Sequence, residues 1–227
     1  MNAAHTLPST PRQIMLVDDH EVMREGFARL IEAEPDLTVS QQFGTAREFL
    51  SAATRQAPDL AVIDICLDDV HGLELIKNLR AHIESLPILA LSMYDESLYA
   101  ERAMRAGANG YVTKRSSAET VLHAIRTVLD GELWLALEVR NRMVNKFLGR
   151  QSADASSLEG LSDREFEVFQ LIGQGLKLRH ISERLGISPK TVDTYRTHLK
   201  TKLNLNSGAE LVRCALHWVD TCALRNP

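Results

Sequence analysis

Five residues whose side chains can do chemistry stand at the end of, or just after, short apolar runs in the first half of the chain: Asp18, Asp19, Asp64, Ser92 and Lys114. Clustered carboxylates repel one another, and a hard divalent cation such as Mg²⁺ relieves the repulsion by taking oxygen ligands. A hydroxyl and an ammonium can donate to the remaining oxygens of a phosphoryl group. A carboxylate can itself act as a nucleophile and form an acyl phosphate. Brought together, these residues would form a metal-assisted phosphoryl-transfer site.

The elements that carry these residues alternate between two kinds. The apolar, β-branched runs predict strands at Ile14–Val17, Leu37–Phe43, Leu60–Ile63, Ile88–Leu91 and Gly110–Thr113. The segments between and after them predict helices at about Glu21–Glu34, Ala46–Gln56, Leu73–His82, Glu96–Ala106 and Ala118–Leu129. This alternation predicts an α/β fold with a doubly wound, five-stranded parallel sheet. Ligands of such sheets bind at the carboxyl ends of the strands, so the five residues are expected to converge there.

Each of these residues also has a simpler interpretation. Asp18 and Asp19 could do no more than cap the helix that follows them. Lys114 could be a solvated surface lysine. The two interpretations differ in whether the side chains meet.

Composition excludes several classes of protein. Of 227 residues, 44% are hydrophobic and 25% are charged, which is typical of a folded globular chain. No apolar run reaches about 18 residues, so no transmembrane helix is predicted, and the first residues lack the pattern of a secretory signal. The three cysteines, Cys66, Cys214 and Cys222, are too few for a disulfide framework. We therefore expect a protein of the reducing cytoplasm with no membrane contact.

Charge is divided unevenly along the chain. Residues 1–130 carry 12 basic and 19 acidic side chains, whereas residues 131–227 carry 14 and 11. Within Lys177–Lys202 there are seven basic and two acidic side chains. Unless this is a chance fluctuation, it predicts an acidic pocket in the first part and a polyanion contact in the second.

Four segments, LVDDHEVMREGF, AVIDICLDDVHGLELI, ILALSMYDE and GANGYVTKRS, together resemble a response-regulator receiver domain of the flavodoxin-like kind. The resemblance covers about residues 13–129 and implies a role for each polar residue. Asp64 would be the phosphoacceptor. Mg²⁺ would be bound by Asp18 (mainly through water), Asp19, Asp64 and the backbone carbonyl of Cys66. Ser92 and Lys114 would contact the phosphoryl group, and Ser92 and Tyr111 would form a switch pair in which Tyr111 turns inward. Without the resemblance, Tyr111 could simply pack on the sheet.

The sequence departs from that family's common pattern at two places. Asp68 stands where many relatives have proline, and Asp69 lies beside it. These carboxylates could raise the affinity for metal, repel the phosphoryl group or face water. Met93 follows Ser92 where a small residue is common, and a bulky side chain there could slow access of a phosphodonor.

The sequence pattern of the second part of the chain predicts helices. A helix is expected at Glu138–Leu148 and a flexible linker at residues 149–157, where the sequence is GRQSADASS. A capping box at Ser162 and Glu165 predicts the start of a further helix. Two helices joined at Gly186, followed by a last helix near Ala209, predict either a plain helical bundle or a helix-turn-helix motif. The local excess of basic side chains favours DNA binding.

The segment LSDREFEVFQLIGQGLKLRHISERLGISPKTVDTYRTHLKTKLNL resembles a LuxR-type DNA-binding domain. The whole chain then resembles a NarL/FixJ-subfamily response regulator. The expected parts are a receiver domain at 12–131, a linker at 132–157 and a four-helix DNA-binding domain at 158–227. The resemblance implies a cognate sensor histidine kinase, an active homodimer and promoter half-sites in double-stranded DNA.

An apolar stripe on the helix after Ser188 predicts which of its side chains face DNA. Val192, Leu199 and Leu203 must face the core, with Tyr195 at its edge, so the opposite face is free for DNA. The expected DNA-binding residues are Lys190, Thr191, Asp193, Thr194, Arg196, Thr197, Lys200 and Lys202. The lysines and the arginine are assigned to phosphates, and the threonines at 194 and 197 to base edges or a thymine methyl. Asp193 could accept from cytosine N4 or could stabilise the helix N-terminus.

Two other functions are compatible with parts of the sequence. A receiver used only as an interaction module would give a DNA-binding regulator that does not need phosphorylation. A phosphohydrolase with an aspartyl intermediate usually needs a second acid two residues after the nucleophile, and Cys66 stands there instead. We therefore expect a phosphoacceptor in phosphotransfer rather than an enzyme with turnover, apart from slow autodephosphorylation.

Overall fold

A computed structural model describes residues 10–93, 96–148 and 157–224 of the chain. The chain divides into two compact units, Met1–Ala136 and Leu137–Pro227. Residues 149–156 of the expected linker lie outside the described residues. The predicted domain limits remain predictions.

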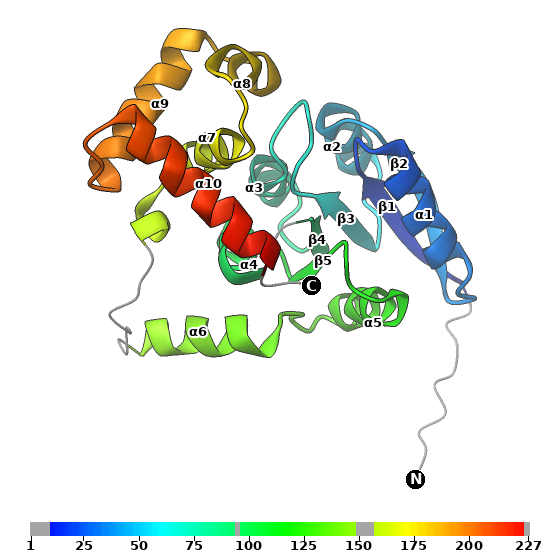
Figure 1. The fold of residues 1–227 in the computed structure, drawn as a ribbon. Coiled ribbons are helices and arrows are strands. Elements are labelled where there is room, and N and C mark those ends of the chain that lie inside the picture. The colour runs from blue at the N-terminus through cyan, green and yellow to red at the C-terminus, as the bar shows by residue number, and fades with distance from the viewer. Residues whose placement is uncertain (1–9, 94–95, 149–156, 225–227) are drawn as a thin grey trace. The chain divides into compact units, whose positions relative to one another are not determined.

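The first unit is the expected α/β domain (Figure 1). Its strands are β1 (Arg12–Val17), β2 (Leu37–Phe43), β3 (Leu60–Asp64), β4 (Ile88–Ser92) and β5 (Gly110–Thr113). Its helices are α1 (Glu21–Glu32), α2 (Ala46–Arg55), α3 (Gly72–His82), α4 (Glu96–Ala106) and α5 (Ala118–Leu129). The strands are parallel in the order β2-β1-β3-β4-β5. The predicted doubly wound sheet is therefore confirmed, and its order reverses between β1 and β3.

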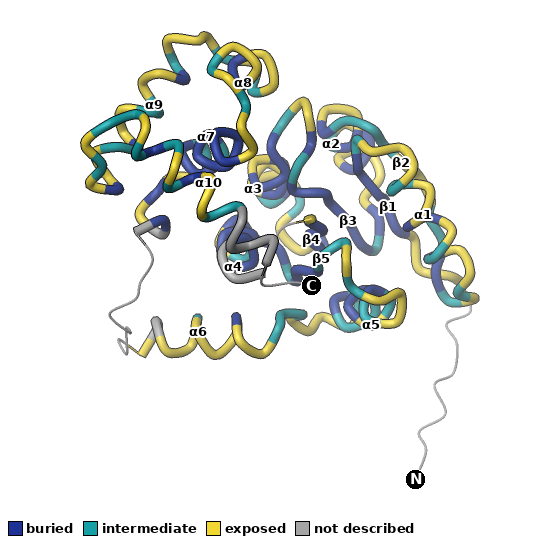
Figure 2. The backbone as a smooth tube through the Cα atoms, in the orientation of Figure 1, coloured by how far each residue is buried: buried dark blue, intermediate teal, exposed yellow. Residues whose placement is uncertain are grey.

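Helices cover both faces of this sheet. The inward faces of α1 and α5 pack with the strands into one buried cluster that includes Phe27, Ile31, Ile125 and Val128. The helices α2, α3 and α4 neighbour one another on the other face (Figure 1). Because both faces are covered, β3 and β4 are buried over their whole length, which Figure 2 shows in dark blue. Sheets of this kind bind their ligands at the carboxyl ends of the strands.

After α5 the chain returns to the outer edge of β5, where Trp134 forms an isolated bridge with Gly110. The Tyr111 amide donates to the Trp134 carbonyl at 3.0 Å, and the Trp134 amide donates to the Asn109 carbonyl at 3.1 Å. A side chain at Gly110 would come within 2.9 Å of both Leu89 and Val128. The chain therefore remains bound to the sheet as far as Trp134.

The second unit is helical, as predicted. It contains α6 (Leu137–Phe147), a 3₁₀ turn (Ser157–Gly160), α7 (Asp163–Gly173), α8 (Leu178–Leu185), α9 (Pro189–Lys202) and α10 (Gly208–Leu224). The predicted capping box at the start of α7 is present, with Ser162 and Glu165 each bonding the other's backbone amide. Among the described residues, no helix is both long enough and apolar enough to cross a membrane.

The helices of the second unit pack around aromatic side chains. Phe166 and Phe169 lie with ring centroids 5.3 and 6.0 Å from that of Trp218. A side chain at Gly173 would meet the carbonyl oxygen of Ala215 at 2.5 Å, so α7 and α10 come together at a position that only glycine allows. This packing fixes the frame on which α8 and α9 are presented.

Candidate functional site

The first strand delivers two carboxylates to the reversal point of the sheet. Asp18 follows the last residue of β1, its side chain is fully buried, and its amide donates to the Phe43 carbonyl at 3.1 Å. Its Oδ1 accepts from the amide of His20 at 2.9 Å, which turns the chain into α1. This bond goes to the N-cap residue itself, and α1 has no side-chain cap hydrogen bond, so Asp18 does not act as the cap of α1. Its second oxygen, Oδ2, points to the other strand ends.

Lys114 joins the two buried carboxylates. Its Nζ lies 2.7 Å from Asp18 Oδ2 and 2.8 Å from Asp64 Oδ2, and the three side chains are 2%, 0% and 1% exposed. The interpretation of Lys114 as a solvated surface lysine is therefore wrong. One ammonium faces two carboxylates, so the pocket keeps a surplus of negative charge.

Burial sets the protonation behaviour of this group. It raises the pKa of Asp64 above its ordinary value, because the loss of hydration outweighs the attraction of Lys114. Burial also opposes the charge on Lys114, but Asp64 and Asp18 outweigh burial and raise the pKa of the ammonium. The lysine therefore stays charged, while ionised Asp64 is costly unless further positive charge is nearby.

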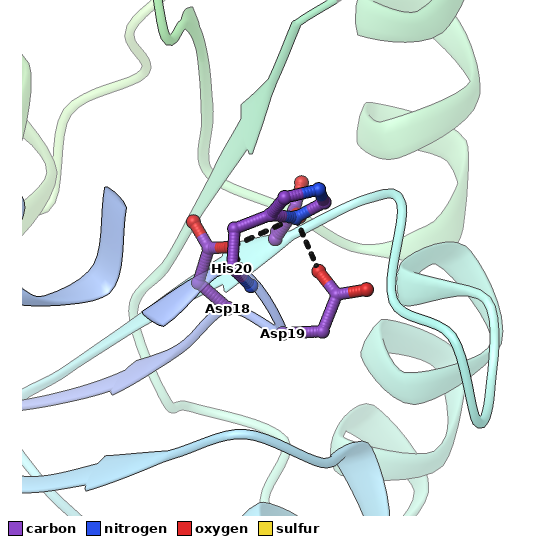
Figure 3. Close-up of side chains that lie close together, drawn as sticks. Asp18, Asp19 and His20 are labelled. Atoms are coloured by element: carbon purple, nitrogen blue, oxygen red, sulfur yellow. Dashed lines mark hydrogen bonds and ion pairs between the residues drawn. The ribbon is translucent and has the colours of Figure 1, made fainter. Parts of the chain in front are cut away.

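Asp19 completes the acidic set, and its partner is His20, which was not predicted from the sequence. His20 Nδ1 lies 2.8 Å from Asp19 Oδ1 and 3.6 Å from Asp18 Oδ1 (Figure 3). Burial raises the pKa of Asp19, and His20 opposes this shift. The sequence did offer a signal for His20, since histidine is a common metal ligand and this one directly follows two aspartates.

The donor atoms of this cluster fit a divalent cation. One ligand atom from each of Asp18, Asp19, His20 and Asp64 lies within 4.8 Å of the others. Three of the four are carboxylate oxygens, the ligand class that Mg²⁺ prefers. The amide of Cys66 donates to Asp64 Oδ1 at 3.2 Å, so the loop after β3 lines the same pocket.

Ser92 and Tyr111 lie on adjacent strands and are both fully buried. Ser92 ends β4 and is paired in register with Thr113, and its carbonyl accepts from the Lys114 amide at 2.7 Å. Tyr111 occupies an inward position on β5 in this structure. The hydroxyl of Ser92 is therefore carried to the strand ends where the other residues meet, while Tyr111 stands earlier on its strand.

Two unusual carboxylates after β3 have different surroundings. Asp69 Oδ1 and Oδ2 accept from the backbone amides of Ala46 and Arg47, so Asp69 caps α2. This role differs from the three that were expected, namely raising metal affinity, repelling the phosphoryl group or facing water. Asp68 is exposed, and its charge contributes to the raised pKa of Asp19. Met93 is 47% exposed.

In the second unit, α9 presents the expected face. Ser188 caps the helix by accepting from the Thr191 amide, and Val192 and Leu199 are fully buried. Five of the predicted DNA-contact residues are exposed: Lys190, Asp193, Thr194, Thr197 and Lys202. Thr191, Arg196 and Lys200 are half-buried at the flanks, and Tyr195 is half-buried as expected for the edge of the core.

Lys202 is already engaged within the unit. Its Nζ lies 2.7 Å from Glu165 Oε2 and donates to the Gly160 carbonyl at 3.2 Å. Glu165 is buried and also accepts from the Ser162 amide at 2.8 Å. A phosphate contact by Lys202 would require this pair to break. His198, on the same helix, lies 3.6 Å from Glu165 Oε1 and was not predicted to matter.

Comparison with known proteins agrees with both units. Residues 14–126 match the response regulator receiver domain, and residues 159–215 match the luxR family of bacterial regulatory proteins. The chain is 34% identical over 200 residues to the transcriptional regulatory protein UhpA of Escherichia coli, covering 88% of this chain and 95% of UhpA. It is 32% identical over 210 residues to the oxygen regulatory protein NreC of Staphylococcus epidermidis, covering 90% and 96%.

A solved structure shares the fold. RcsB from Salmonella enterica serovar Typhimurium, bound to promoter rprA in the presence of phosphomimetic BeF3-, superposes with a TM-score of 0.64 at 20% identity, covering 90% of this chain and 98% of that one. The chain therefore belongs to the NarL/FixJ-type response regulators: it is a response regulator transcription factor with a receiver domain and a LuxR-type DNA-binding domain.

Proposed function

We propose that phosphorylation of Asp64 controls this transcription factor, with a sensor histidine kinase or a small phosphodonor as the source. A carboxylate oxygen of Asp64 attacks the phosphorus, the bond to the donor's nitrogen or oxygen breaks, and an acyl phosphate forms. The leaving group takes up a proton from solvent. The observation that carries the proposal is the buried contact of Lys114 with both Asp18 and Asp64, at 2.7 and 2.8 Å.

The same pocket would hold Mg²⁺ through Asp19, Asp64 and the backbone carbonyl of Cys66, with Asp18 acting mainly through water. The surplus of carboxylates over ammonium supports this, because a buried negative charge needs compensation. When bound, the cation offsets charge on the phosphoryl oxygens. Lys114 and Ser92 would contact phosphoryl oxygens, and Asp19 Oδ1, which now lies 2.8 Å from His20 Nδ1, would be a ligand of the cation.

Phosphorylation is read out by the buried pair Ser92 and Tyr111. The hydroxyl of Ser92 is drawn toward the phosphoryl group, and Tyr111, two positions before the residue that pairs with Ser92 on the neighbouring strand, adjusts in turn. The surface formed by α4 and β5 then changes. This biases the chain toward a homodimer that binds two half-sites in double-stranded DNA.

In the DNA complex, α9 lies in the major groove. Lys190, Arg196 and Lys200 contact phosphates, with Thr191 at the helix start, and Lys202 ranks last because of its pair with Glu165. The hydroxyls of Thr194 and Thr197 already donate to backbone carbonyls one turn earlier. They therefore offer base edges an acceptor and a methyl group. A regulator of this kind works where the DNA is, in the cytoplasm.

The test is the intact mass of the chain after incubation with Mg²⁺ and acetyl phosphate. One added phosphoryl group is expected in the wild type and in Asp68→Asn, which alters an exposed carboxylate nearby, and none in Asp64→Asn. Gel-shift assays on a selected promoter fragment should then show that acetyl phosphate tightens binding by the wild type and Asp68→Asn but not by Asp64→Asn. Labelling of Asp64→Asn would overturn the assignment. Equal DNA binding by the wild type and Asp64→Asn, each tested with and without acetyl phosphate, would favour the phosphorylation-independent alternative.

A further inference from the structure

The carboxylate of Asp69 reaches from the loop after β3 to the start of α2, 22 positions away in sequence from the nearer amide. Its Oδ1 accepts from the Ala46 amide at 3.0 Å, and its Oδ2 accepts from the Arg47 amide at 3.2 Å. A helix leaves its first four amides without partners inside the helix. Two of those of α2 are therefore satisfied by a residue of a different segment.

The next two amides of α2 bond to Thr45, the N-cap residue. The Glu48 amide donates to Thr45 Oγ1 at 3.4 Å, and the Phe49 amide makes the first regular helical bond, to the Thr45 carbonyl at 3.2 Å. Thr45 and Asp69 thus divide the capping of α2 between them. The helix itself is firmly held, since Phe49 and Ala53 are fully buried.

The loop that carries Asp69 is also fixed at its base. The Gly72 amide donates to the Ile65 carbonyl at 2.9 Å, and a side chain at Gly72 would meet the Asp64 carbonyl oxygen at 2.3 Å. Between these points Cys66 donates its amide to Asp64 Oδ1 at 3.2 Å. The base of the loop is therefore pressed against the phosphoacceptor strand, and Asp69 ties the far side of the loop to α2.

We propose that Asp69 is a positioning residue of the phosphoacceptor pocket: by capping α2 it holds the loop so that the Cys66 backbone stays aligned with Asp64 and with a bound divalent cation. This inference rests on the proposed function, because it concerns the same pocket. A carboxylate suits the role because both oxygens accept and its charge is favourable at a helix N-terminus. An outer partner of a metal site influences affinity in this indirect way without touching the cation.

The inference is tested with the full chain and three variants. Asp69→Ala removes both hydrogen bonds, Asp69→Asn keeps one acceptor oxygen without the charge, and Thr45→Val removes the local cap while Asp69 remains. The measurements are the dissociation constant for Mg²⁺ by isothermal titration calorimetry, and the rate of acetyl phosphate labelling at limiting and at saturating Mg²⁺. Thermal unfolding identifies variants that do not fold.

We expect Asp69→Ala to bind Mg²⁺ about tenfold more weakly, in line with the loss of a partner outside the ligand shell. Labelling should slow at limiting Mg²⁺ and recover at saturation. Asp69→Asn should lie between Asp69→Ala and the wild type. Thr45→Val should lower the unfolding temperature of the receiver domain and leave the affinity for Mg²⁺ unchanged. If Asp69→Ala fails to fold, the comparison of Asp69→Asn with Thr45→Val decides the question.

Three outcomes would overturn the inference, and they differ from failure of the proposed function. Wild-type affinity for Mg²⁺ in Asp69→Ala would show that the loop holds its position alone. Equal losses in Asp69→Asn and Asp69→Ala would point to a charge effect rather than to positioning. Equal losses in Thr45→Val would point to fraying of α2. If the wild type neither binds Mg²⁺ nor accepts a phosphoryl group, the proposed function itself fails, and the inference falls with it.

Discussion

The two functional regions of this chain are built in opposite ways. The receiver pocket gathers Asp18, Asp64 and Lys114 from three separate strands, and each of these side chains is at most 2% exposed. The DNA-facing surface of the second unit comes from one helix, α9, and its Thr194 and Thr197 are exposed. In the pocket, the charges that would do the chemistry are part of the core, whereas on α9 the core and the contact surface lie on opposite sides of the same helix.

This difference has a consequence for mutants. A change in the pocket alters stability and function together, because a buried charge must be compensated by its neighbours. A change on the exposed face of α9 can alter function with little change in stability, because exposed charges are already solvated.

The largest effect is expected for Lys114→Ala. The variant leaves two buried carboxylates without their ammonium, so the free energy of unfolding should fall by about 3–5 kcal/mol in the absence of Mg²⁺. Labelling by acetyl phosphate should also be lost, since Lys114 lies beside the proposed nucleophile. Urea unfolding followed by circular dichroism measures the first effect, and intact mass measures the second.

The matched control is Lys77→Ala, which removes an exposed lysine of α3. Its free energy of unfolding should change by no more than about 0.5 kcal/mol. If the two variants were equally stable, the pocket would be better hydrated than the structure indicates, and the contrast between the two regions would weaken.

One charge in the second unit should behave like those of the pocket. Burial opposes ionisation of Glu165, but hydrogen bonds from Lys202 and Ser162 outweigh it and hold the pKa of the carboxyl below its ordinary value. Glu165→Gln should lower the free energy of unfolding by about 1.5–3 kcal/mol at neutral pH, the range for hydrogen bonds to charged groups.

The pH dependence of this effect has a definite sign. Because the pKa of Glu165 is lower in the folded state, its contribution is complete above the ordinary carboxyl pKa and is lost as pH falls through the lowered value. The difference between wild type and Glu165→Gln should therefore shrink on acidification. The control, Glu183→Gln, removes the partner of an exposed pair with Arg179 and should cost no more than about 0.5 kcal/mol. A difference between wild type and Glu165→Gln that does not depend on pH would show that Glu165 acts through packing rather than charge.

Asp64→Asn should separate stability from function within the pocket. The substitution leaves one carboxylate, Asp18, for one ammonium, Lys114, so the receiver domain should become more stable by about 1–2 kcal/mol without Mg²⁺. Phosphoryl labelling should be lost at the same time. Unfolding in urea with and without Mg²⁺ tests this. A cation that binds the folded wild type stabilises it, so Mg²⁺ should reduce the difference in free energy of unfolding between Asp64→Asn and the wild type. A less stable variant would mean that the Asp64 charge is fully compensated in the wild type.

The convergence of the pocket could be predicted from sequence because it follows from a rule of the fold. Parallel strands place their carboxyl ends at one edge, so residues after β1, β3, β4 and β5 had to meet there. The exposed side of α9 followed equally well from the apolar stripe through Val192 and Leu199. Both inferences depend only on the type and the period of the elements.

Individual partners of side chains could not be predicted in this way. Asp69 bonds to α2 and Lys202 bonds to Glu165, and in each case the partner is more than 20 positions away in sequence. Neither pairing follows from strand order or helical period, since each depends on how loops and helix ends meet in space. His20 is an intermediate case. Its position next to Asp19 is visible in the sequence, but the contact of its ring with the Asp19 carboxylate is not.

The smallest effect on stability, with a clear effect on specificity, is expected for Asp193→Asn. Asp193 is 69% exposed and lies 3.9 Å from Arg196, too far for a strong pair. As a carboxylate it can only accept, which suits cytosine N4, whereas asparagine both donates and accepts, which suits adenine. Selection from random DNA should therefore shift one position of the half-site from cytosine to adenine. Because the variant also removes a charge that phosphates repel, overall affinity should not fall. An unchanged base preference, together with a lower unfolding temperature of the second unit, would assign Asp193 to the N-terminus of α9 instead.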